Sequence, residues 1–145
     1  MICTFCGHSD CNTSELYPKI KKEVEKLIVH GVATFYSGGY GGFDMLALKV
    51  VSELQEKYPH IQNILVFAYL SEEHTSKYRD ILSRYHAESI YPFDKKILPR
   101  FAIIKRNQWM IKNSDFVISA TKFHLGGCGL SLEYAQKLQK NIIYI

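Results

Sequence analysis

Short apolar runs alternate along the chain with longer stretches in which apolar residues recur every three or four positions. The short runs are typical of strands, and the longer stretches are typical of amphipathic helices. Strands are predicted over residues 2–6, 32–36, 64–70, 88–91, 116–120 and 142–145. Helices are predicted over residues 14–30, 42–57, 72–85, 99–113 and 129–139. This alternation of strands and helices is the order that parallel βαβ units produce.

Three local features support this pattern. Gly31 follows the first predicted helix, at the position where a left-handed residue commonly ends a helix. Pro99 lies in the first turn of the fourth helix, where its missing N–H has no cost. Residues 64–70 are continuously apolar, as in a strand buried on both faces. We predict an α/β fold, a Rossmann-like three-layer sandwich with a mostly parallel sheet, formed by residues 1–145 as one domain.

Glycines cluster where predicted strands end. In open parallel sheets, ligands bind beyond the carboxyl ends of the strands, where the strand order reverses. Three glycine-containing segments occur there: residues 7–8, 37–42 and 126–129. Glycine lets the backbone approach a ligand closely, and a helix N-terminus offers N–H groups to a phosphate. The expected ligand contacts are Gly7, His8, Ser37, Gly38, Gly39, Tyr40, Asp44, Gly126, Gly127 and Gly129.

The first glycine-rich segment, residues 37–44, has the sequence SGGYGGFD. It lacks the Gly-Lys-Ser/Thr end of a P-loop, and Asp44 stands where a dinucleotide G-x-G-x-x-G needs its last glycine. Its glycines form either a phosphate or ribose cradle or simply a tight turn between strand and helix. Asp44 either accepts a hydrogen bond from a sugar hydroxyl or only places a favourable charge at the helix N-terminus.

The second glycine-rich segment, residues 126–133, has the sequence GGCGLSLE and follows the helical sequence RNQWMIKN at 106–113. Glu133 lies one turn into the predicted helix, where it either points toward a ligand or is an exposed acid. The order of these segments resembles the SLOG superfamily, which includes LOG-type ("lonely guy") nucleotide phosphoribohydrolases, YpsA-like proteins and nucleotide-sensing domains. Residues 5–8 and 41–47 are similar to the YpsA-like branch. Arg106 and Glu133 fall on the LOG positions implicated in cleaving the N-glycosidic bond of a nucleoside 5′-monophosphate.

The resemblance leaves three functions open. Leu130 stands where the family has threonine, and Ser9 stands where it has a basic residue. These differences favour a protein that binds a nucleotide or NAD-derived small molecule as a sensor, carrier or sequestering module. The alternative is a LOG-like N-glycosidase with Arg106 and Glu133 as catalytic residues and an oxocarbenium-like transition state. A protein-interaction scaffold is the third. The resemblance also implies a homo-oligomer, a dimer or larger.

Cysteines and a histidine cluster near the N-terminus. Cys3, Cys6, His8 and Cys11 are residue types that zinc accepts. Successive strand residues face opposite sides, so Cys3 and Cys6 diverge if the strand runs through Cys6. We therefore expect no bound metal, and we expect no cofactor. A Cys6–Cys11 redox pair is an alternative. Cys128 is either a reactive thiol at a helix N-terminus or merely a small residue there.

Composition narrows the partners. The chain of 145 residues has 18 Lys and Arg against 14 Asp and Glu, a net charge of +4. This excess suits a nucleotide-type small molecule but argues too weakly for nucleic acid, which we do not expect as a partner. No apolar run approaches the roughly 18 residues of a membrane span, so no membrane partner is expected. Four cysteines without a signal-peptide pattern favour the cytoplasm.

Overall fold

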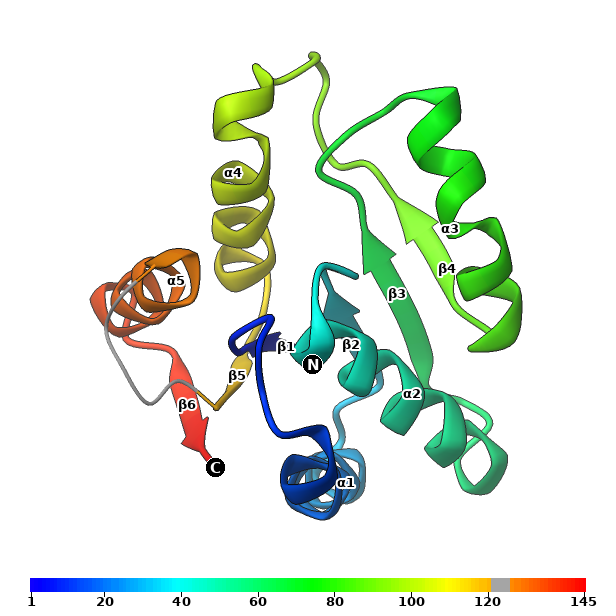
Figure 1. Ribbon diagram of the computed structural model, residues 1–145. Helices are drawn as coiled ribbons and strands as arrows, with labels where there is room; N and C mark the ends of the chain where they lie inside the picture. The colour runs from blue at the N-terminus through cyan, green and yellow to red at the C-terminus, as the bar shows by residue number, and fades with distance from the viewer. Residues whose placement is uncertain (121–125) are drawn as a thin grey trace.

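The computed structural model describes residues 1–120 and 126–145. Its strands are β1 (Ile2–Cys6), β2 (Thr34–Ser37), β3 (Gln62–Val66), β4 (Glu88–Ile90), β5 (Phe116–Ser119) and β6 (Asn141–Tyr144). Its helices are α1 (Thr13–His30), α2 (Gly42–Lys57), α3 (Glu72–Arg84), α4 (Pro99–Lys112) and α5 (Gly126–Lys137). These strands form one parallel sheet in the order β4-β3-β2-β1-β5-β6. The predicted α/β sandwich is confirmed (Figure 1).

The strand order reverses at β1. The chain moves outward from β1 through β2 and β3 to β4, and it then returns through α4 to place β5 on the other side of β1. Cys6, the last residue of β1, lies opposite Ser119, the last residue of β5. Connections leave these two strand ends in opposite directions, which opens a crevice between them.

Helices cover both faces of the sheet because alternate strand residues point to opposite sides. In β3, Leu65 packs with Leu48 of α2 and Tyr78 of α3. Its neighbour Val66 packs with Met110 of α4. Accordingly α1, α2 and α3 lie on one face, and α4 and α5 lie on the other (Figure 1). Among the residues that the structure describes, no helix is both long and apolar enough to cross a membrane.

Most predicted boundaries agree with the structure to within about two residues, and two differences are informative. Gly31 ends α1 with a φ of 113°, as predicted. The third strand is Gln62–Val66 rather than 64–70, because the apolar run continues through the buried Phe67 and Ala68 after the strand has ended. Helix α5 begins at Gly126, three residues before the predicted start. Glycine is a poor helix former, so the glycines at the start of α5 indicate a loop when only the sequence is considered.

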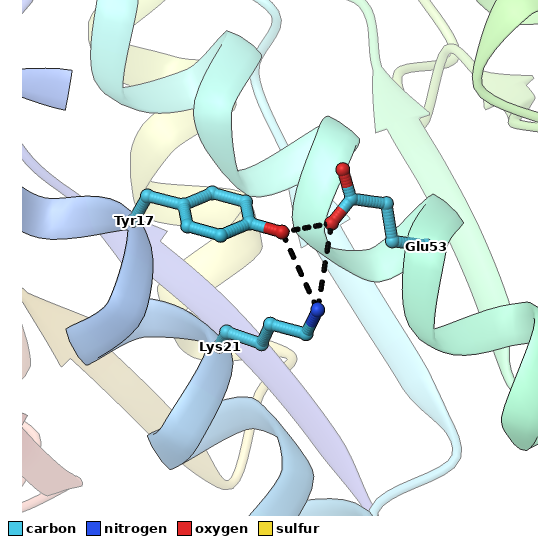
Figure 2. Close-up of polar contacts among 3 residues, drawn as sticks. All are labelled: Tyr17, Lys21 and Glu53. Carbon is cyan, nitrogen blue, oxygen red and sulfur yellow. Dashed lines mark hydrogen bonds and ion pairs between the residues drawn. The ribbon is translucent and has the colours of Figure 1, made fainter. Parts of the chain in front are cut away.

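Polar contacts join α1 and α2 on the solvent side of their interface. Tyr17 donates a hydrogen bond to Glu53 Oε2, and Lys21 Nζ lies 3.3 Å from the Tyr17 hydroxyl and 3.8 Å from Glu53 (Figure 2). Such exposed pairs contribute little to stability. The packing of α1 and α2 therefore rests on the apolar core beneath them, which includes Ile20 and Val24.

Candidate functional site

A pocket of about 310 Å³ occupies the crevice where the strand order reverses. The end of β1, the segment from Tyr40 to Asp44, α4 and the first turn of α5 all contribute to its wall. Its charged and polar side chains include His8, Ser9, Tyr40, Asp44, Arg106 and Asn107. Segments far apart in the sequence thus meet at the carboxyl ends of β1 and β5, where open parallel sheets bind ligands.

Arg106 of α4 is buried at the back of this pocket, with 3% of its surface exposed. Its Nη1 donates to the carbonyls of Gly38 (2.7 Å) and Val66 (3.0 Å), and its Nε donates to Asn107 Oδ1 (2.8 Å). Burial lowers the pKa of Arg106, and Asp44 opposes this shift. Nη2 has no hydrogen-bond partner among the described residues. Three hydrogen bonds therefore hold the guanidinium in place at the pocket wall.

Asp44 lies in the first turn of α2 and is the carboxylate of the pocket wall. Its Oδ2 accepts a hydrogen bond from the backbone N–H of Tyr40 at 3.0 Å. Burial raises the pKa of Asp44 to about 6, against the opposing effects of Arg106 and of the Tyr40 hydrogen bond. A carboxyl group that titrates near neutral pH inside a pocket is typical of functional sites.

The glycines of residues 38–41 make room for other parts of the protein. A Cβ on Gly38 would lie 2.6 Å from Arg106 Cζ, and one on Gly39 would lie 2.4 Å from Leu65 Cδ1. Gly41 has a φ of +92°, and a Cβ there would lie 2.3 Å from Ser9 Cβ. Of residues 37–42, only Tyr40 lines the pocket. The glycines therefore serve the tight turn, and Ser37, Gly38 and Gly39 lie outside the pocket wall.

The glycines at the start of α5 border open space. Gly126 and Gly127 are exposed and line the pocket, and a Cβ on either would meet no atom within 4 Å among the described residues. They lie in the first turn of a helix, where backbone N–H groups have no partner within the helix. Backbone N–H groups at a helix N-terminus can bind an anion. Gly129 is buried and lies outside the wall.

Gly7 and His8, which the sequence predicts as ligand contacts, follow β1 and both line the pocket. Gly7 has a packing role as well, since a Cβ there would lie 2.2 Å from the ring of Phe43. His8 Nε2 is shielded from solvent and has no hydrogen-bond partner among the described residues. Because an unpaired buried ring nitrogen is costly, His8 is a candidate contact for a ligand in this pocket.

The residues that the resemblance pairs for catalysis lie in different surroundings. Arg106 lines the pocket, whereas Glu133 is exposed on α5 and is not part of the pocket wall. Leu132 and Ala135 of α5 pack against the sheet, and this sets the rotation of the helix that points Glu133 to solvent.

The pocket also contains residues that sequence reasoning missed. Asn107 and Ser131 line it, as does Cys6, whose Sγ lies 3.4 Å from Cys128 Sγ. Asn107 could have been suspected as the neighbour of Arg106. No sequence signal joins Cys6 to Cys128, because 122 positions separate them and only the packing of α5 beside β1 brings them together.

The N-terminal cysteines do not converge. Cys3 packs into the core beneath α1 and α2, whereas Cys6 packs on the opposite face with Leu132 of α5. Cys6 therefore pairs spatially with Cys128 rather than with Cys11. Within residues 1–120 and 126–145, no three His, Cys, Asp or Glu side chains are grouped as they would be to hold a metal ion.

Comparison with known proteins identifies the family. A family model, YpsA, described as the YspA SLOG family, matches residues 4–122. The chain belongs to the YspA SLOG family. A relative from Streptococcus pyogenes serotype M49 (strain NZ131), the UPF0398 protein Spy49_1277c, is 32% identical over 81 residues, which are 55% of this chain and 48% of that protein. The UPF0398 protein SPs0474 of Streptococcus pyogenes serotype M3 (strain SSI-1) is also 32% identical over 81 residues, which are 47% of that protein. The chain thus spans about half the length of these curated relatives.

Two solved structures share the fold of this SLOG protein. DNA processing protein A from Helicobacter pylori, reported for its single-stranded DNA binding mode, aligns with a TM-score of 0.68 and 19% identity over 99% of this chain and 64% of that one. DNA processing protein A from Streptococcus pneumoniae aligns with a TM-score of 0.70 and 17% identity. The alignment covers 98% of this chain and 49% of that one. The expectation that nucleic acid is not a partner is therefore corrected, because a protein with this fold binds single-stranded DNA. A net charge of +4 was too weak a reason to exclude it.

Proposed function

We propose that the pocket binds a nucleotide without cleaving it and holds its phosphate at the first turn of α5. The open approach to Gly126 and Gly127 at a helix N-terminus carries this proposal. A phosphate there accepts hydrogen bonds from backbone N–H groups and gains from the helix dipole. Arg106 supplies a second, positively charged donor from α4. This makes the site selective for anions in a chain whose overall charge excess is small.

The remaining wall suits the sugar and the base. Asp44 and His8 offer hydrogen-bonding groups of the kind that a ribose hydroxyl or a base edge needs, and the two residues come from different segments of the pocket. Tyr40 is 61% exposed and lines the same pocket, so its ring is accessible for stacking on a base. A phosphate, a sugar and an aromatic base would each find a matching surface.

Binding is favoured over hydrolysis by the position of Glu133. The glycosidase alternative needs a carboxylate beside the sugar to stabilise an oxocarbenium-like transition state. Glu133 is exposed and lies outside the pocket wall. Leu130, in place of the family's threonine, is also exposed and removes a hydroxyl from the phosphate side.

Single-stranded DNA is a second candidate ligand. The observation that favours it is the fold likeness to the H. pylori DNA processing protein A. A nucleotide unit within a DNA strand also offers a phosphate, a sugar and a base, but its phosphate is a diester and its sugar lacks the 2′-hydroxyl. The affinities of the pocket for free nucleotides and for oligodeoxythymidylate therefore separate the two candidates. Gly127→Val is expected to weaken the binding of either ligand.

The test combines native mass spectrometry with chromatography. The protein is incubated with the four ribonucleoside 5′-monophosphates, with NAD or with oligodeoxythymidylate. We expect one intact ligand per chain and no free base. Gly127→Val, which narrows the open approach, should lose the ligand, whereas Gln136→Val, which puts the same side chain on an exposed part of α5, should keep it. Release of free base that disappears in Glu133→Gln would overturn the proposal in favour of a glycosidase.

A further inference from the structure

The pocket wall contains two thiols that nearly touch. Cys6 Sγ and Cys128 Sγ lie 3.4 Å apart, and Cys6 Sγ lies 3.2 Å from the Cys128 carbonyl oxygen. Cys6 ends β1, and Cys128 lies in the first turn of α5. Both residues line the pocket.

Closing the pair into a disulfide requires only a small movement of the two sulfurs. The sulfur–sulfur distance of 3.4 Å must shorten by about 1.4 Å to reach the bond length of about 2.05 Å. Cys6 is held at the end of β1 by its pairing with Ser119 of β5, and its carbonyl accepts a hydrogen bond from the backbone N–H of Ala120. Cys128 follows Gly127, which borders open space. The movement is therefore available on the α5 side, where no strand pairing opposes it.

The other two cysteines compete poorly. Cys3 is fully buried on the opposite face of the sheet, and burial raises its pKa. Burial also raises the pKa of Cys11, and the neighbouring Asp10 and Asp44 carboxylates add to this effect. Because the thiolate is the attacking species, a raised pKa disfavours reaction at Cys3 and at Cys11.

We propose that Cys6 and Cys128 form a dithiol modification site that a low-molecular-weight disulfide oxidises to an intramolecular disulfide. Cys128 is the more exposed of the two and reacts first: its thiolate attacks one sulfur of the reagent, whose S–S bond breaks to release one thiolate. The Cys6 thiolate then attacks Cys128 Sγ and displaces the second reagent thiolate. The two cysteine protons end on the released thiols. Two cysteine sulfurs are oxidised, and one reagent disulfide is reduced.

Oxidation also changes the wall that faces the ligand. Closing the bond draws the first turn of α5 toward β1 and displaces Gly126 and Gly127 from the position where they face the pocket. This consequence rests on the proposed function. Loss of one or two well-aligned backbone hydrogen bonds to phosphate weakens binding about tenfold.

The experiment treats the reduced protein with oxidised glutathione and maps the product by intact mass and non-reducing peptide digestion. We expect the loss of two hydrogen atoms, a Cys6–Cys128 linked peptide, and a fall in titratable thiols from four to two. Cys11→Ser is the matched control and should still form the bond. Cys128→Ser cannot form the intramolecular bond. In this variant, Cys6 should stay reduced or carry glutathione as a mixed disulfide. A stable glutathione adduct on the wild-type protein, or a Cys6–Cys11 link, would overturn the assignment without depending on any variant.

The ligand readout separates this inference from the proposed function. AMP is titrated into the reduced and the oxidised protein. Binding to the reduced form that weakens about tenfold on oxidation supports the coupling, whereas equal affinity of both forms refutes it. If neither AMP nor another nucleotide binds the reduced form, the proposed function fails and the coupling fails with it. The peptide map still decides whether the dithiol site exists.

Discussion

Two glycine-rich segments follow strands of the same sheet, yet they serve opposite purposes. At Gly38, Gly39 and Gly41 the space that a side chain would need is occupied by Arg106, Leu65 and Ser9. At Gly126 and Gly127 no atom of the described residues occupies that space, and both glycines line the pocket. The density of glycine in the sequence is higher in the first segment, but the open surface belongs to the second. What a missing side chain makes room for is therefore more informative than the number of glycines.

The largest effect is expected at Gly41. Alanine there would adopt a φ of +92° and would bring its Cβ to 2.6 Å from Ser9 Cα, a backbone atom that cannot move aside freely. We expect Gly41→Ala to lower the free energy of unfolding by about 3 kcal/mol, as measured by urea denaturation. A loss below about 0.5 kcal/mol would show that this segment is as open as the first turn of α5.

A somewhat smaller loss is expected when the group packed against Gly38 is removed. Arg106→Met leaves the carbonyls of Gly38 and Val66 without their side-chain donor and leaves Asp44 without its nearby cation. We expect a loss of about 2 kcal/mol in the free energy of unfolding. Arg100→Met, on the exposed first turn of the same helix, is the control and should change stability little. Equal stability of the two variants would show that the buried hydrogen bonds contribute nothing.

Asp44 should make stability depend on pH. Its folded pKa of about 6 lies above the ordinary 3.8, so burial of the carboxylate destabilises the native state, increasingly as pH rises from 3.8 to about 6. Asp44→Asn removes this cost. We expect the variant to be more stable than the wild type by about 1 kcal/mol at about pH 7.5 and equally stable at about pH 4. Thermal unfolding at both pH values measures the difference, and a gain that is independent of pH would contradict the assignment.

The smallest effect on stability is expected at Gly127. An alanine Cβ there meets no atom of the described residues within 4 Å, and alanine replaces a poor helix former within α5. We expect Gly127→Ala to change the free energy of unfolding by less than about 1 kcal/mol, and in the stabilising direction. A loss comparable to that of Gly41→Ala, measured in the same urea experiment, would mean that the two segments are not different.

The sequence was sufficient for the alternation of strands and helices, for α2 at its observed bounds and for the placement of a pocket at strand ends. These features depend on local periodicity and on the general behaviour of parallel sheets. It did not predict the start of α5, because Gly126 and Gly127 are poor helix formers. It also could not predict that Glu133 faces solvent, because the rotation of α5 is set by Leu132 and Ala135 packing on the sheet. The meeting of Cys6 with Cys128 likewise depends on tertiary packing alone.

The most direct test of the proposed phosphate site is calorimetric titration of nucleoside 5′-monophosphates and oligodeoxythymidylate into wild-type protein, Gly127→Val and Gln136→Val. We predict one ligand per chain for the wild type and for Gln136→Val, and affinity at least about tenfold weaker for Gly127→Val, with all three proteins folded. Unchanged affinity in Gly127→Val, or no heat of binding with any of these ligands in the wild type, would contradict a phosphate site at the first turn of α5.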